Sequence, residues 1–109
     1  MLAKKFRLPI QNWFKEKKGA IVRKSDFFAV KTRESNLPFS RYGVVVSRKV
    51  SGFAVRRNKI KRIIFNFIRL EKLQETSGRD VLIIVSPLAS KLTKQKIETE
   101  LKSLLTANR

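Results

Sequence analysis

The stretch AVRRNKIKRIIFNF, from Ala54 to Phe67, decides how this chain folds, because it combines five cations with large apolar residues and contains no carboxylate. At about 100° per residue its apolar and polar side chains separate onto two arcs of a helical wheel. Extended to residue 70, the inward arc holds Ile60, Ile63, Ile64, Phe67, Ile68 and Leu70, and the outer arc holds Asn58, Lys59, Lys61, Arg62, Asn66 and Arg69. The sequence therefore predicts one helix that fills a core and presents a cationic outer face.

The absence of acids extends well beyond this helix, since no Asp or Glu occurs from Ser35 to Leu70. A solvated surface helix normally places acids four residues from its cations. Arg48 and Lys49 end a predicted strand, Tyr42 to Val50, and a short loop then leads into the helix. These cations should lie near the helix N-terminus, where free N–H groups and the dipole attract phosphate. The pattern favours a polyanion-binding surface over an ordinary solvated face.

Composition supports the same interpretation. The chain has 109 residues, 26 Lys and Arg against 8 Asp and Glu, a net charge of +18 and a pI near 11.3. Such an excess indicates a polyanionic partner, either a nucleic acid or an anionic membrane surface. The hydrophobic fraction of 42% is that of a globular protein. We predict a single domain over residues 1–109.

Several chemistries are excluded. There is no cysteine and no histidine, so disulfides, thiolate metal sites and the usual neutral-pH acid or base are absent. The eight acids are scattered, and a nuclease that holds two metal ions needs clustered carboxylates. We therefore expect no catalytic residue in this chain. No apolar run is long enough for a membrane span or a signal peptide, so we expect a cytoplasmic protein.

The rest of the chain alternates between helical and strand patterns. We expect a helix from Pro9 to about Lys17, two strands on either side of Lys24 to Asp26, interior strands at Tyr42–Val50 and Val81–Ser86, and a last helix capped by Thr93. In that last helix Ile97, Leu101, Leu104 and Leu105 share one face. The prediction is an α+β domain with a mixed sheet of about four strands and three helices.

The run SRKVSGFAVRRNKIKR, from Ser47 to Arg62, resembles the signature of the bacterial ribonuclease P protein component, with Arg57 to Arg62 as its core. The N-terminal Arg7-Leu8, Gly19, an aromatic strand near Phe27 and the terminal helix follow in the family's order. This resemblance implies an α/β sandwich like the second domain of ribosomal protein S5. It also implies a left-handed β-α-β crossover, against the general right-handed preference.

The resemblance further implies the protein subunit of a ribonucleoprotein that removes the 5′ leader from precursor tRNA. In that family the catalytic centre and its Mg²⁺ belong to the RNA subunit, so the partners would be that RNA and the leader. RNA contacts are assigned to Arg57, Asn58, Lys59, Lys61 and Arg62, with Arg48 and Lys49 nearby, and the charge pattern adds Arg56 and Arg69. With about seven phosphate contacts, log K should fall against log salt with a slope of roughly −5 to −6.

One departure from the family is Phe65, where an arginine is common. The wheel places this ring among the cations, so we expect it either to stack on a base or to touch a protein surface.

The family's second site is a cleft between the sheet and the N-terminal helix. Phe14, Trp13, Lys31 and one of Phe27 and Phe28 would hold the single-stranded leader there, by stacking that tolerates varied sequence. Strand alternation places the other phenylalanine in the core, and we favour Phe27 for the cleft. Ile10 stands where the family often has an aromatic residue.

Three other functions would suit the charge. A ribosomal-type or chaperone-like RNA-binding protein is the main alternative, and a protein that places the basic helix in a DNA groove is another. The signature favours ribonuclease P over both, so we expect no DNA partner. A membrane-surface helix is less favoured, because it would leave the predicted sheet uncovered.

Overall fold

The computed structural model describes residues 2–15, 19–76 and 78–106. Its elements are η1 Lys4–Phe6, α1 Ile10–Lys15, β1 Ile21–Lys24, β2 Phe28–Glu34, β3 Arg41–Val45, α2 Ala54–Leu70, η2 Leu73–Glu75, β4 Arg79–Val85, η3 Pro87–Lys91 and α3 Lys94–Thr106. The first helix begins one residue after Pro9, and its predicted end at Lys17 lies outside the described residues. The predicted α+β class with four strands and three α-helices is confirmed for the described part of the chain.

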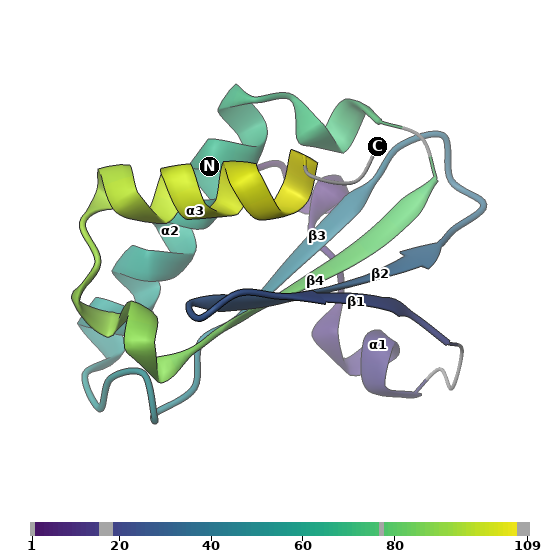
Figure 1. The fold of residues 1–109 in the computed structure, drawn as a ribbon. Helices are drawn as coiled ribbons and strands as arrows, with labels where there is room; N and C mark the ends of the chain where they lie inside the picture. Colours follow the sequence, from purple (N-terminus) through teal and green to yellow (C-terminus); the bar gives the residue numbers. More distant parts are fainter. Residues whose placement is uncertain (1, 16–18, 77, 107–109) are drawn as a thin grey trace.

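The four strands form one mixed sheet in the order β1-β2-β4-β3 (Figure 1). The β1–β2 and β2–β4 pairs are antiparallel, whereas β3 and β4 run parallel. A parallel pair needs a long crossover connection, and α2 supplies it between β3 and β4. The helix with the cationic face is therefore fixed to the sheet at both of its ends.

The structure corrects the prediction for β3. The strand ends at Val45, and residues 48–50 form a turn, so Arg48 and Lys49 lie on a loop and not at a strand end. β3 is also an edge strand, whereas β4 is interior as predicted. The outer edge of β3 is partly covered by the N-terminal segment, because Arg7 forms a β-bridge with Tyr42 and the Leu8 N–H donates to the Tyr42 carbonyl at 2.9 Å.

Helices cover both faces of the sheet, with α2 and α3 on one side and α1 on the other (Figure 1). Alternate residues of β4 separate accordingly. Val81, Ile83 and Val85 join the main core under α2 and α3, while Leu82 joins a smaller cluster with Leu8 and Trp13 under α1. This two-sided burial explains why β4 is continuously apolar from Val81 to Val85.

The inward arc of α2 is largely confirmed. Ile60, Ile64, Phe67 and Ile68 are buried in the main core, and Ile63 packs against it. Leu70 was predicted to face inward but is 61% exposed. Leu70 is the last residue of α2. A helical wheel gives the direction of a side chain, but it does not show whether other residues pack against the last turn of the helix.

The predicted last helix is also confirmed. The Lys96 N–H donates to the Thr93 hydroxyl at 3.2 Å, which caps α3 at its start. Ile97 and Leu101 are fully buried, and Leu104 and Leu105 pack against the same core.

Candidate nucleic-acid interface

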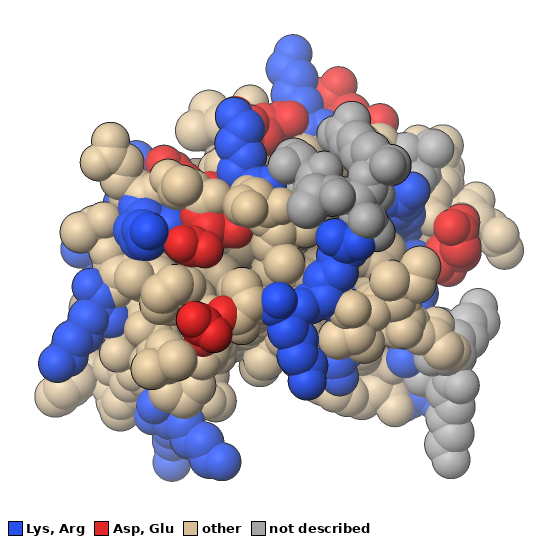
Figure 2. All heavy atoms as spheres, viewed as in Figure 1, with Lys and Arg blue, Asp and Glu red and all other residues tan. Residues whose placement is uncertain are grey.

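The outer side of α2 and the loop before it carry exposed cations without a neighbouring acid. We call this surface the α2 face, and it consists of Arg48, Lys49, Asn58, Lys59, Lys61, Arg62 and Arg69. All of these are exposed except Lys61, which is half-buried. Cations also occur elsewhere, since Figure 2 shows them spread over the side that carries α3, with acidic side chains in smaller patches among them. The α2 face differs from that side because no acid lies within residues 35–70.

Arg56 does not belong to this face. Its Nε and one terminal nitrogen donate to the Ser90 carbonyl at 3.1 and 2.6 Å, and that nitrogen also lies 3.3 Å from the Leu92 carbonyl. The half-buried guanidinium thereby joins the first turn of α2 to η3 and to Leu92, the residue that follows η3. These hydrogen bonds give Arg56 a structural role and do not support the prediction that it contacts RNA.

Arg57 is intermediate between the two cases. One terminal nitrogen donates to the Ser51 carbonyl at 2.9 Å, and the side chain is half-buried. Arg57 therefore stabilises the loop that carries Arg48 and Lys49. One nitrogen of its guanidinium is used by this hydrogen bond within the protein.

The structure also corrects Phe65. The ring is only 7% exposed and belongs to the main core, so it offers no open face to a base. The N-terminal segment lies beside α2 here, since Leu2 is buried in the same cluster and Arg7 and Leu8 line the adjoining groove. Of the two alternatives for Phe65, contact with a protein surface is the one realised, and that surface is part of the same chain.

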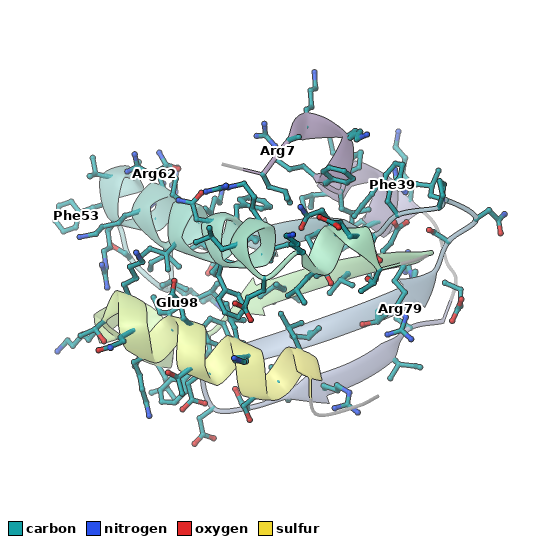
Figure 3. The ribbon with its side chains drawn as sticks, turned by 90° about the horizontal axis from the view of Figure 1, so that it is seen from above. Arg7, Phe39, Phe53, Arg62, Arg79 and Glu98 are labelled. Carbon is teal, nitrogen blue, oxygen red and sulfur yellow. The ribbon has the colours of Figure 1, made fainter. Side chains whose placement is uncertain are left out.

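The groove beside Phe65 runs between the N-terminal segment, β3 and α2, with a volume of about 570 Å³. Its walls are apolar at Leu8, Ile10, Val44 and Phe65, and cationic or polar at Arg7, Asn58, Lys61 and Arg62. Figure 3 shows Arg7 on the N-terminal segment and Arg62 on α2, the two elements that border this groove. The α2 face thus continues into a groove with a basic rim.

The loop before α2 carries one residue that the sequence argument missed. Phe53 occupies the N-cap position of α2, makes no side-chain cap and is 79% exposed. Ser, Thr, Asp or Asn normally fills an N-cap. The missing cap residue and the preceding glycine were the signals in the sequence that could have drawn attention to this position.

On the opposite face of the sheet, Trp13 and Phe14 have different environments. Trp13 is 4% exposed, and the Arg33 guanidinium lies 3.8 Å from the centre of its ring while donating to the Trp13 carbonyl at 2.9 Å. The structure does not support the prediction that Trp13 stacks on the leader, because one ring face is covered by Arg33 and the ring is buried. Phe14 is 64% exposed and keeps its ring open to solvent.

Lys31 lies on the same side of the sheet as α1. Strand register pairs it with Val22 on β1 and with Leu82 on β4, and Leu82 packs against Trp13. The register also places Lys24 and Ala29 on this side. We call the set Val22, Lys24, Ala29 and Lys31 the α1-side face. Val22 is 47% exposed and Lys31 is half-buried, so this part of the sheet remains open.

Phe28 is the core phenylalanine of the predicted pair, with 1% exposure. Phe27 is half-buried and packs against the main core, which lies under α2 and α3. The structure thus associates Phe27 with the face opposite α1, because the chain bends at residues 26–27 before β2 begins. Strand alternation does not apply to a residue in a bend, which is why Phe27 does not join α1 and Phe14.

Neither a metal site nor a membrane helix appears in the described residues. No group of three or more Asp, Glu, His or Cys side chains within residues 2–15, 19–76 and 78–106 could hold a metal ion. Asp80 is held by Arg41 at 2.9 and 2.7 Å. No helix in that part of the chain is both long and apolar enough to cross a bilayer.

A second groove lies near β2 and α3 and has a volume of about 840 Å³, larger than the groove beside Phe65. None of the predicted site residues lines it.

A small α+β domain with an acid-free cationic helix face has the surface of a polyanion-binding protein. A comparison with protein families matches residues 3–108 to the family described as Ribonuclease P. The ribonuclease P protein component of Syntrophus aciditrophicus is 38% identical over 79 residues, which are 72% of this chain and 66% of that protein. This chain therefore belongs to the ribonuclease P protein family.

Solved structures agree with the family match. The RNase P protein from Thermotoga maritima superposes with a TM-score of 0.82 at 28% identity, over 94% of this chain and 97% of that one. The Staphylococcus aureus RNase P protein gives a TM-score of 0.81 at 27% identity, over 95% of each chain. Sequence alignments with the first curated relatives span about two thirds of their length or less.

Proposed function

We propose that this chain is the protein subunit of ribonuclease P, the endoribonuclease that removes the 5′ leader from precursor tRNA. The observation that carries the proposal is the family match over residues 3–108, together with an exposed α2 face that contains no acid. The α2 face binds the catalytic RNA, and the α1-side face with Phe14 binds the leader.

The α2 face suits a folded RNA because it combines forked and point-like cations on a rigid element. The planar guanidinium of Arg62 can donate hydrogen bonds to two phosphate oxygens at once, whereas Lys59 supplies a mobile point charge. Both side chains are exposed, and the helix beneath them is anchored by its buried isoleucines. Little ordering is then needed on binding, which favours affinity.

The α1-side face suits a single strand. The Arg33–Trp13 contact and the apolar cluster around Leu82 hold α1 against the sheet, so Phe14 is presented from a fixed support. The strand surface on the same side of the sheet carries Lys31 and the exposed Val22. An exposed ring beside cations binds unpaired bases by stacking with little sequence preference, as a leader of variable sequence requires.

The reaction itself is assigned to the RNA. Hydrolysis of a phosphodiester by two metal ions needs oxygen ligands in a cluster, and the described residues of this chain contain no such cluster. The described residues therefore do not fit a protein-bound Mg²⁺. Magnesium in the working enzyme would be held by the RNA subunit.

The test is reconstitution with ribonuclease P RNA and a precursor tRNA at limiting Mg²⁺. Arg62→Ala should weaken assembly with the RNA, whereas Arg79→Ala, which removes the same charge from the far end of the molecule (Figure 3), should not. Phe14→Ala should reduce the preference for precursor over mature tRNA, and Leu88→Ala, which truncates another exposed apolar residue, is its control. If the wild-type protein gives no gain in cleavage, the proposal is wrong. Equal effects of Arg62→Ala and Phe14→Ala on both measurements would contradict two separate sites.

A further inference from the structure

Among the described residues, Phe53 is the most exposed large apolar residue, with an exposed fraction of 79%. Single exposed apolar residues are common on protein surfaces, so exposure alone indicates nothing. Phe53, however, occupies an N-cap, where the side chain of Ser, Thr, Asp or Asn would stabilise α2 by accepting a hydrogen bond from a free backbone N–H. Figure 3 shows its ring at the end of the molecule, directed away from the protein body. The ring contributes little to the fold at a position where another residue would contribute more.

The backbone that carries this ring is nevertheless fixed. Val50 is 5% exposed in the main core, and its N–H donates to the Ser47 carbonyl at 3.0 Å. The Phe53 N–H donates to the Ser51 hydroxyl at 3.2 Å, and Arg57 holds the Ser51 carbonyl at 2.9 Å. A side chain presented from such a loop loses little backbone freedom when it binds a partner.

The charges around the loop select the kind of partner. Arg48 and Lys49 are exposed in the same loop, and no acid occurs between residues 35 and 70. A second copy of this chain, also at +18, would be repelled, and an apolar protein partner would have to desolvate the cations. An exposed ring next to cations is the combination that binds unpaired nucleotides, with stacking for the base and charge for the phosphate.

We propose that Phe53 is a stacking platform for an unpaired base of the RNA that lies on the α2 face. The inference rests on the proposed function, since it assumes that RNA binds there, and it adds a requirement for a single-stranded nucleotide at the N-terminal end of α2. The ring has no hydrogen-bonding group, so it selects unpaired over paired bases and does not select base identity.

The test uses fluorescence anisotropy with the full chain and two probes, an oligouridylate of about 12 nucleotides and an RNA duplex of similar length. Every form, including the one with Phe53 intact that serves as wild type, carries Phe14→Ala, so that the oligouridylate does not bind at the proposed leader site. Phe53→Ala should weaken oligouridylate binding roughly tenfold, since one stacked base is worth about 1–3 kcal/mol by alanine substitution. Duplex binding should stay within about twofold, because paired bases cannot stack on the ring. Phe53→Trp should restore the affinity. Leu70→Ala, an exposed truncation at the other end of α2, is the matched control.

Salt dependence separates stacking from charge. Phe53→Ala should leave the slope of log K against log salt unchanged, whereas Arg48→Ala should make it shallower by about 0.7 to 0.9. If wild type binds both probes with a steep slope and Phe53→Ala equals Leu70→Ala, the stacking inference is wrong and the proposed function stands. If wild type shows no salt-dependent RNA binding, the proposed function itself is wrong. A shallower slope for Phe53→Ala would also overturn the inference, because the ring would then act by positioning the loop cations.

Discussion

Replacing Arg56 by alanine should destabilise the fold while leaving the salt dependence of RNA binding nearly unchanged. Its guanidinium donates to the Ser90 and Leu92 carbonyls, and hydrogen bonds to a charged group are worth about 1.5–3 kcal/mol. The side chain is half-buried, so the lower value of about 1.5 kcal/mol is the better expectation. For a domain of this size that loss corresponds to a decrease in Tm of roughly 6–12 °C.

Arg62→Ala should have the opposite profile, because Arg62 is exposed on the α2 face. The exposed cations of that face are Arg48, Lys49, Lys59, Arg62 and Arg69. The structure thereby reduces the expected number of phosphate contacts to about five, and the salt slope to roughly −3.5 to −4.5. Arg62→Ala should make the slope shallower by about 0.7 to 0.9 and change Tm little.

Thermal unfolding and binding of ribonuclease P RNA over a range of KCl concentrations measure the two effects. The reasoning would be refuted if Arg56→Ala made the salt slope shallower by as much as Arg62→Ala and left Tm unchanged. Such a result would mean that the Arg56 contacts with η3 are weak in solution and that its charge faces the RNA.

Three further substitutions test the packing that presents these surfaces. Gly43→Ala would place a Cβ 2.7 Å from Ile10 Cδ1, the end of a flexible side chain, and 3.3 Å from the Leu8 Cβ. The Ile10 side chain should therefore reorient, at a cost of about 1 kcal/mol in unfolding experiments, and unchanged stability would contradict this packing. Arg33→Leu removes the contact with the Trp13 ring and its carbonyl, and should increase amide exchange in α1 while RNA affinity at the α2 face stays constant; unchanged exchange would mean that α1 is held by other contacts. Gly78→Ala forces a side chain into a backbone with φ of +63°, so it should lower the free energy of unfolding by about 1 kcal/mol or more, and an unchanged chemical-denaturation midpoint would count against this strain.

The sequence alone predicted the elements whose pattern is local. The β-branched runs became β3 and β4, and the spacing of Ile60, Ile64 and Phe67 identified the buried side of α2. These predictions succeeded because strand and helix periodicity depend on the same few residues that form the core.

The site predictions that the structure does not support depended on contacts between distant segments. Phe65 lies among cations on the wheel, but the N-terminal segment packs beside it, and a wheel contains no information about a segment more than 50 residues away. Arg56 could not be separated from Arg62 because its carbonyl partners come from η3. Trp13 was judged from its position in a short helix, without knowledge of Arg33 opposite its ring.

The crossover position of α2 links RNA binding to folding. The cations of the α2 face are arranged on one surface only when β3 and β4, the two strands that α2 connects, have paired. An unfolded chain has the same charges, but they are not held on one surface. RNA that binds the native arrangement more tightly must then stabilise the fold by mass action, by about 2.7 kcal/mol when the free RNA exceeds its Kd by about a hundredfold. The same RNA also neutralises the self-repulsion of the +18 charge. An RNA partner bound at the α2 face would therefore stabilise the folded protein, and the protein without RNA should be the less stable and more readily degraded form.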